Sequence, residues 1–94
     1  MPRVARQILV AHAQGLHARP AALFVQLAKR FNSRITVARG RRSADGKSIM
    51  ELLTLAVASG SEIRIVADGP DAQEAVDRLC HFVSRPLVEP AHGS

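Results

Sequence analysis

The segment Gly15-Leu16-His17-Ala18-Arg19-Pro20-Ala21 stands where the chain changes from the period of a strand to the period of a helix. Before it, apolar residues alternate up to Val10, as in a strand with one buried face. After it, from residue 18 to about residue 32, an apolar stripe recurs at helical spacing. The stripe consists of Ala21, Phe24, Val25, Ala28 and Phe31. The proline falls in the first turn, where a missing N–H breaks no helical hydrogen bond.

The rest of the chain follows from the same two periods. We expect strands at 35–38, 43–45 and 63–67, a helix from Ser48 to about Ala58, and a final helix from 72 to 84. Asp71 and Glu74 have the spacing of a capping box at the start of that last helix. The order β-α-β-β-α-β-α in one domain indicates an α+β fold, an open-faced sandwich in which helices cover one side of the sheet.

Length and composition set the outer limits. With 94 residues, 47% of them apolar, the chain supports one domain, which we place at residues 1–85, followed by a flexible tail at 86–94. One cysteine, Cys80, excludes an internal disulfide framework. No run approaches the roughly 18 apolar residues of a membrane span, and the N-terminus does not resemble a signal peptide. We therefore expect a cytoplasmic protein without membrane insertion.

The net charge of +5 favours an acidic partner. Nucleic acid is one candidate, but the chain has no Trp or Tyr to form a stacking platform for single strands. The densest basic cluster is Arg39, Arg41 and Arg42. It is explained either by contacts to a phosphate backbone or by a solvated hairpin tip, and we favour the hairpin tip.

His17 has the strongest chemical signal among the four histidines, because it directly precedes a predicted helix. A helix N-terminus offers unpaired N–H groups and partial positive charge, which favour an anion. Arg19 lies in the same first turn and can contact phosphate oxygens. A neutral imidazole is a nucleophile near neutral pH. The segment therefore suits phosphoryl chemistry, and the simpler alternative is that His17 only caps the helix. No histidine or cysteine spacing indicates a metal site.

Two segments in register resemble the signatures of one family. Residues 15–22, GLHARPAA, resemble the phosphorylation site of HPr, the phosphocarrier of the bacterial phosphoenolpyruvate-dependent sugar phosphotransferase system (PTS), and residues 47–55, KSIMELLTL, resemble its serine site. The resemblance extends from about Arg3 to Ser84. It implies a four-stranded antiparallel sheet with three helices on one face.

For function, the resemblance implies that the Nδ1 atom of His17 accepts a phosphoryl group from enzyme I and passes it to IIA domains. Such a chain is a carrier without turnover of its own and needs no metal or cofactor. The alternatives are a paralogue of the regulatory or nitrogen-related kind, an interaction module on the same fold that typically lacks the histidine, and a small basic nucleic-acid-binding protein.

Ser48 also has two interpretations. Ser48 and Glu51 fit a capping box, which predicts a helix N-cap. The resemblance adds a regulatory phosphoserine made by HPr kinase/phosphorylase. Members under that control commonly have a small or uncharged residue where Glu51 stands, and this favours the cap.

Five apolar residues are candidates for partner docking. In a short helix Ile49, Met50 and Leu53 cannot all face inward, and the resemblance assigns Ile49 and Met50 to the docking surface. Leu23 and Leu27 lie at the edge of the first helix's stripe, where they form either a docking rim or part of a wide core. We expect the carrier to be a monomer.

Overall fold

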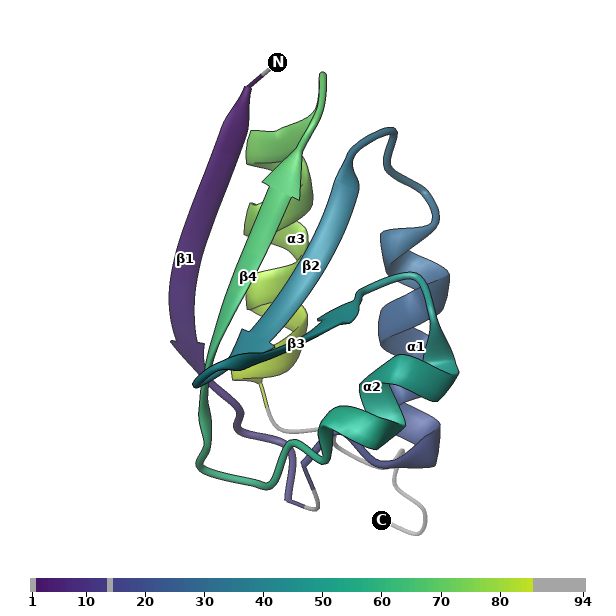
Figure 1. Ribbon diagram of the computed structural model, residues 1–94, viewed down its shortest axis with the longest axis vertical. Helices are drawn as coiled ribbons and strands as arrows, with labels where there is room; N and C mark the ends of the chain where they lie inside the picture. The colour runs from purple at the N-terminus through teal and green to yellow at the C-terminus, as the bar shows by residue number, and fades with distance from the viewer. Residues whose placement is uncertain (1, 14, 86–94) are drawn as a thin grey trace, which may run out of the picture.

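The computed structural model describes residues 2–13 and 15–85 of the chain. Over these residues it has the order β1 (Arg3–Leu9), α1 (Ala18–Ala28), β2 (Arg34–Arg39), β3 (Arg42–Asp45), α2 (Ile49–Leu55), β4 (Glu62–Asp68) and α3 (Ala72–Ser84). The strands form one antiparallel sheet in the order β1-β4-β2-β3, with the helices on one side (Figure 1). The predicted α+β architecture is confirmed. The tail predicted at 86–94 lies outside the described residues.

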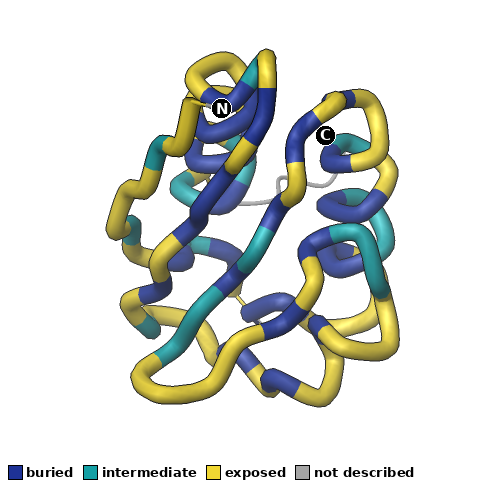
Figure 2. Tube along the Cα trace, turned by 45° about the horizontal axis from the view of Figure 1, so that its top comes forward, coloured by how far each residue is buried: buried dark blue, intermediate teal, exposed yellow. Residues whose placement is uncertain are grey.

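The sheet buries the face that carries its alternating branched residues. β4 pairs with β1 on one side and β2 on the other, so Ile65 lies opposite both Arg6 and Val37. Ile63, Ile65 and Ala67 are at most 1% exposed, beneath the helices (Figure 2). Val66, on the other face, is also buried, although the alternation placed it on the wetter side. It sits in the central strand between neighbours on both sides, so the adjacent strands shield it.

All five residues of the predicted stripe are buried, and four of them, all except Phe31, lie within helix α1. It ends at Ala28, earlier than the predicted residue 32. Beyond it, the N–H groups of Arg30 and Phe31 bond to carbonyls three residues back, at 3.0 and 3.1 Å. The chain therefore makes a tighter turn directly after α1. The side chain of Phe31 still packs into the core, although the residue lies beyond the end of the helix.

Helix α2 is also shorter than predicted, and charged side chains complete its C-terminal end. Ala56 adopts a left-handed conformation, with φ of 57°, and terminates the helix. Arg39 donates to the carbonyl oxygen of Leu55 at 3.0 and 3.3 Å, and Arg42 donates to that of Thr54 at 3.3 Å. Both interpretations of the basic cluster missed this role. Two of its arginines satisfy open carbonyls and place positive charge at the negative end of the helix dipole.

The predicted capping box at Asp71 and Glu74 is wrong. Asp71 stands at the N-cap position of α3, but its side chain makes no capping bond. Its carboxylate instead accepts from the backbone N–H of Asn32 at 2.8 Å and from the hydroxyl of Ser33 at 2.6 Å. The carboxylate therefore joins the start of α3 to the connection between α1 and β2. Asp71 therefore bonds to partners 38 and 39 residues away in the sequence and not to the N–H groups of its own helix.

These contacts make Asp71 a source of acid sensitivity. The hydroxyl of Ser33 and the N–H of Asn32 hold the pKa of Asp71 below its ordinary value. A carboxyl with a lowered folded-state pKa stabilises the fold above its unfolded pKa of about 3.9, and this stability is lost as pH falls through the folded value. We therefore expect Asp71→Asn to lower the free energy of unfolding at pH 7, with a smaller difference from the native chain at pH 3. Urea unfolding at the two pH values measures this.

Asp68→Asn, at an exposed position of β4, is the matched control and should change the free energy of unfolding little at either pH. An Asp71→Asn deficit of the same size at pH 7 and pH 3 would contradict the assignment.

Candidate functional site

His17 occupies the N-cap position of α1 and is exposed to solvent. Its backbone is extended, with φ of −80° and ψ of −168°, and its carbonyl accepts from the N–H of Ala21 at 2.8 Å. The side chain makes no capping hydrogen bond. The backbone of His17 therefore begins the helix while its imidazole does not bond to the helix end. His17 is thus the N-cap residue of α1, as the simpler alternative has it, through its backbone and not its side chain.

The start of α1 has the features of an anion site. The first turn of α1 contains no acidic residue, and the backbone N–H groups and dipole of a helix start favour an anion. Arg19 is exposed at the second helical position. The exposed imidazole and the side chain of Arg19 thus belong to the same helix start, a combination of groups that favours a phosphoryl group.

The backbone immediately before His17 is fixed against the segment that follows α2. Leu16 is 2% exposed, and its N–H donates to the carbonyl of Val57 at 2.9 Å. Gly15 has a φ of 73°, and a Cβ added there would lie 2.2 Å from the carbonyl oxygen of Val57. A residue with a side chain cannot take this position without moving the backbone. The glycine of the motif is therefore explained by this close approach.

The other end of the same loop is attached to α3. The N–H of Ala11 donates to the carbonyl of Val83 at 2.9 Å, and the ring of His12 lies 3.0 Å from the carbonyl oxygen of Phe82. His12 is 2% exposed, and the sequence analysis did not single it out. One signal was available, because position 12 continues the even-numbered alternation of Val4, Ile8 and Val10.

Three of the five apolar residues of α2 form an exposed patch. Ile49, Met50 and Leu53 are 37%, 73% and 39% exposed, and we call these three residues the α2 patch. The prediction that they do not all face inward is confirmed. Helix α2, which carries the patch, packs against α1 and lies across it in Figure 1.

Leu23 and Leu27 are half-buried, which is intermediate between an exposed docking rim and a buried core stripe. Leu27 packs against the core, and both line a shallow hollow between α1 and α3 with Gln26, Arg30 and Phe82. They border the core and remain partly accessible.

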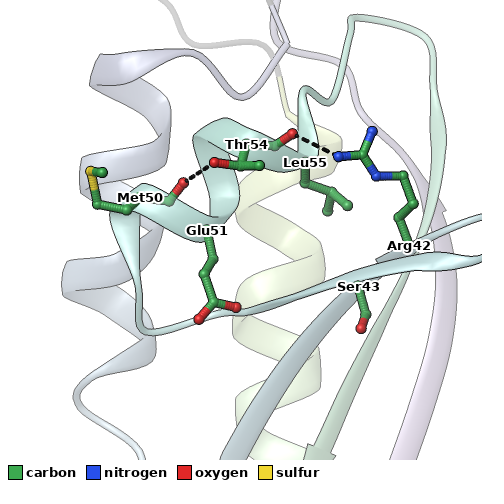
Figure 3. Close-up of a pocket in the computed structure, with 6 residues that line it drawn as sticks. All are labelled: Arg42, Ser43, Met50, Glu51, Thr54 and Leu55. Carbon is green, nitrogen blue, oxygen red and sulfur yellow. Dashed lines mark hydrogen bonds between the residues drawn. The ribbon is translucent and has the colours of Figure 1, made fainter.

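Ser48 is the N-cap of α2, as predicted. Its hydroxyl accepts from the N–H of Glu51 at 3.2 Å. The carboxylate of Glu51 bonds to the N–H of Asp45 at 2.8 Å and leans towards β3 (Figure 3). Asp45 in turn accepts from the N–H of Lys47 at 2.9 Å. Two carboxylates therefore border the serine.

Figure 3 also shows a hollow between α2 and β3, lined by Arg42, Ser43, Met50, Glu51, Thr54 and Leu55. None of these residues belongs to the loop or helix turn that carries His17. Within the described parts of the chain, no three histidine, cysteine or acidic side chains lie together as a metal site, and no helix is long and apolar enough to cross a membrane.

The comparison with known proteins agrees with this geometry. Residues 4–85 match the family model described as the PTS HPr component phosphorylation site. The chain is 47% identical over 78 residues to the phosphocarrier protein HPr of Haemophilus influenzae, covering 83% of this chain and 92% of that one. It is 45% identical over 82 residues to the HPr-like protein Crh of Halalkalibacterium halodurans, covering 87% and 98%.

A solved structure gives the same result for the fold. The HPr of Bacillus anthracis matches with a TM-score of 0.85 at 41% identity, covering 88% of this chain and 99% of that chain. The family match spans the sheet, the three described helices and the His17 segment. This chain therefore belongs to the HPr family of phosphocarrier proteins of the bacterial phosphotransferase system.

Proposed function

We propose that this chain carries a phosphoryl group on the Nδ1 atom of His17, which it accepts from phosphorylated enzyme I and passes to IIA domains. The observation that supports this is the exposed imidazole at the start of α1, which makes no capping bond and has no acidic neighbour in the first turn. The chain acts as a transfer partner in this proposal, without turnover of its own and without a metal or cofactor.

The chemistry needs little from the carrier. The lone pair of Nδ1 attacks the phosphorus atom, the bond from phosphorus to the donor's histidine breaks, and a phosphoramidate forms on His17. The first-turn N–H groups and Arg19 stabilise the phosphoryl oxygens. Because the site is open and lies at the surface, it stabilises the phosphorylated form only modestly, and onward transfer remains favourable.

Among the alternative functions, the observations favour a carrier over a non-phosphorylated module. Relatives include both phosphocarrier HPr and the HPr-like protein Crh, and the presence of His17 in the motif supports the carrier role. The basic cluster offers little to a nucleic acid, since Arg39 and Arg42 are committed to α2.

We propose that transfer is made by the monomer, since partners need simultaneous access to His17 and the α2 patch. Dimers occur among the relatives: one solved structure of the 44%-identical Bacillus subtilis protein is described as that of the dimer Crh.

The phosphoryl site is tested directly by substitution. Incubation with phosphoenolpyruvate and enzyme I should label the native chain with an acid-labile, base-stable phosphate. His17→Ala should abolish the label, and the exposed His81→Ala should keep it. Arg19→Ala should retain the label and lose transition-state contacts, so that kcat/KM falls by roughly tenfold to a hundredfold. An unlabelled native chain in the presence of active enzyme I would refute the proposal.

We further propose that the α2 patch docks the partners of the carrier. Met50→Glu should raise KM for enzyme I about tenfold or more, because a central apolar contact of an interface commonly contributes 1–3 kcal/mol. Its kcat should change little, since the substitution leaves His17 in place. Leu9→Glu is the matched control, because Leu9 is 59% exposed at the end of β1, outside the patch. Equal rises in KM for the two variants would show a general effect of added negative charge.

At Ser48 we propose a helix cap that HPr kinase/phosphorylase modifies poorly. A phosphate there meets the carboxylate of Glu51, whose repulsion opposes the product. Glu51→Gln keeps an oxygen that accepts from the N–H of Asp45 and removes the charge. We expect serine phosphorylation about five-fold faster in this variant, equivalent to about 1 kcal/mol. The measurement is the rate of phosphoserine formation with the kinase and ATP. Ser48→Ala, which lacks the hydroxyl, gives the background signal. Equal rates in the native chain and Glu51→Gln would contradict the electrostatic account.

A further inference from the structure

His12 is a buried histidine that the proposed chemistry does not use. It is 2% exposed and lies in the loop between β1 and α1. Its ring meets the ring of Phe82 edge to face, with centroids 4.9 Å apart and an interplanar angle of 81°. The contact brings the loop that leads to His17 against the last turn of α3.

The hydrogen bond of His12 determines its tautomer. The Nε2 atom lies 3.0 Å from the carbonyl oxygen of Phe82. A carbonyl only accepts, so the proton must be on Nε2, and Nδ1 is left as an unprotonated acceptor. Nδ1 is buried and has no hydrogen-bond partner among residues 2–13 and 15–85. The ring of His12 therefore bonds through Nε2, while Nδ1 has no hydrogen-bond partner among the described residues.

The carbonyl that accepts this bond lies in the last turn of α3. In an α-helix the carbonyl of residue 82 would accept from the N–H of residue 86, and residue 86 is a proline, which has no N–H. The next carbonyl, of Val83, accepts from the N–H of Ala11. The loop before His17 therefore supplies donors to two successive carbonyls at the end of α3.

The same histidine begins the turn that leads to the reactive residue. Its own carbonyl accepts from the N–H of Gly15 at 3.0 Å, and Leu16, the next residue, bonds to Val57. The loop is thus held by α3 at residues 11 and 12 and by Val57 at residue 16. His17 follows directly. The bond from the N–H of Gly15 to the carbonyl of His12 links His12 to the residues directly before His17.

We propose that His12 is a positioning residue for the reaction at His17, acting through its Nε2–H bond to the carbonyl of Phe82. This inference rests on the proposed function, because it concerns the same phosphoryl transfer. The role differs from docking. Misplacing the nucleophile slows the transfer step, whereas loss of an α2 patch residue weakens the encounter with the partner.

Two substitutions separate the hydrogen bond from simple filling of the core. His12→Gln keeps an N–H donor near the position of Nε2, and His12→Met keeps an apolar side chain of similar size without that donor. Steady-state transfer from phosphorylated enzyme I is measured at a temperature well below the melting temperature of each variant. The ¹⁵N signals of the His17 ring are recorded on the unphosphorylated chains.

For His12→Met we expect kcat to fall roughly tenfold with KM nearly unchanged, together with shifted ring signals of His17. His12→Gln should restore kcat to within about two-fold of the native value and return the signals of His17. Two results would overturn the proposal: a lower melting temperature for His12→Met with native transfer and native His17 signals, or equal defects in the two variants.

A third measurement does not depend on the folding of any variant. The ring ¹⁵N shifts of His12 in the native chain should report the proton on Nε2, and a proton on Nδ1 would overturn the proposal. If the native chain takes no phosphate from enzyme I, the proposed function fails. The ring signals of His12 and His17 then still show whether His12 positions the loop.

Discussion

The bond from the N–H of Leu16 to the carbonyl of Val57 holds the reactive end of this molecule together. It attaches the residue before His17 to the segment that leaves α2. For this bond to form, the backbone must approach so closely that Gly15 has no room for a side chain. Leu16 is buried by the same contact, and its neighbour His17 remains at the surface. The buried Leu16 and the exposed His17 are thus adjacent in the chain.

The helices near this point, α1 and α2, differ in how their ends are completed. The first turn of α1 has no acidic residue and no side-chain cap, which leaves it open to an anion. Both ends of α2 are closed by side chains, Ser48 at the start and two arginines at the end. With only seven residues, α2 has a poor intrinsic stability, and these contacts compensate for it. The start of α1, where we propose the phosphoryl site, has no side-chain cap, whereas both ends of α2 are completed by side chains.

Charge in this chain is distributed between internal contacts and the surface. The net charge of +5 suggested an acidic partner, but several of the basic groups have structural partners. Arg39 and Arg42 bond to carbonyls of α2, Lys47 bonds to the carbonyl of Phe31 at 2.8 Å, and Arg6 pairs with Asp77 at 2.7 Å. The Arg6 guanidinium lowers the pKa of Asp77. Net charge alone therefore overstated the basic surface that a partner can use.

The sequence by itself determined the element order, the buried stripe of α1, the N-cap at Ser48 and the position of His17 at a helix start, because periodicity and capping are local properties of neighbouring residues. The tertiary structure decided where the helices end, that Asp71 bonds across to Asn32 and Ser33, and that the basic cluster completes α2. It also decided that His12 is buried against α3. The contacts of Asp71, of the basic cluster and of His12 each depend on a partner at least 12 residues distant along the chain. A donor or acceptor brought into reach by folding competes with local ones without leaving a local pattern.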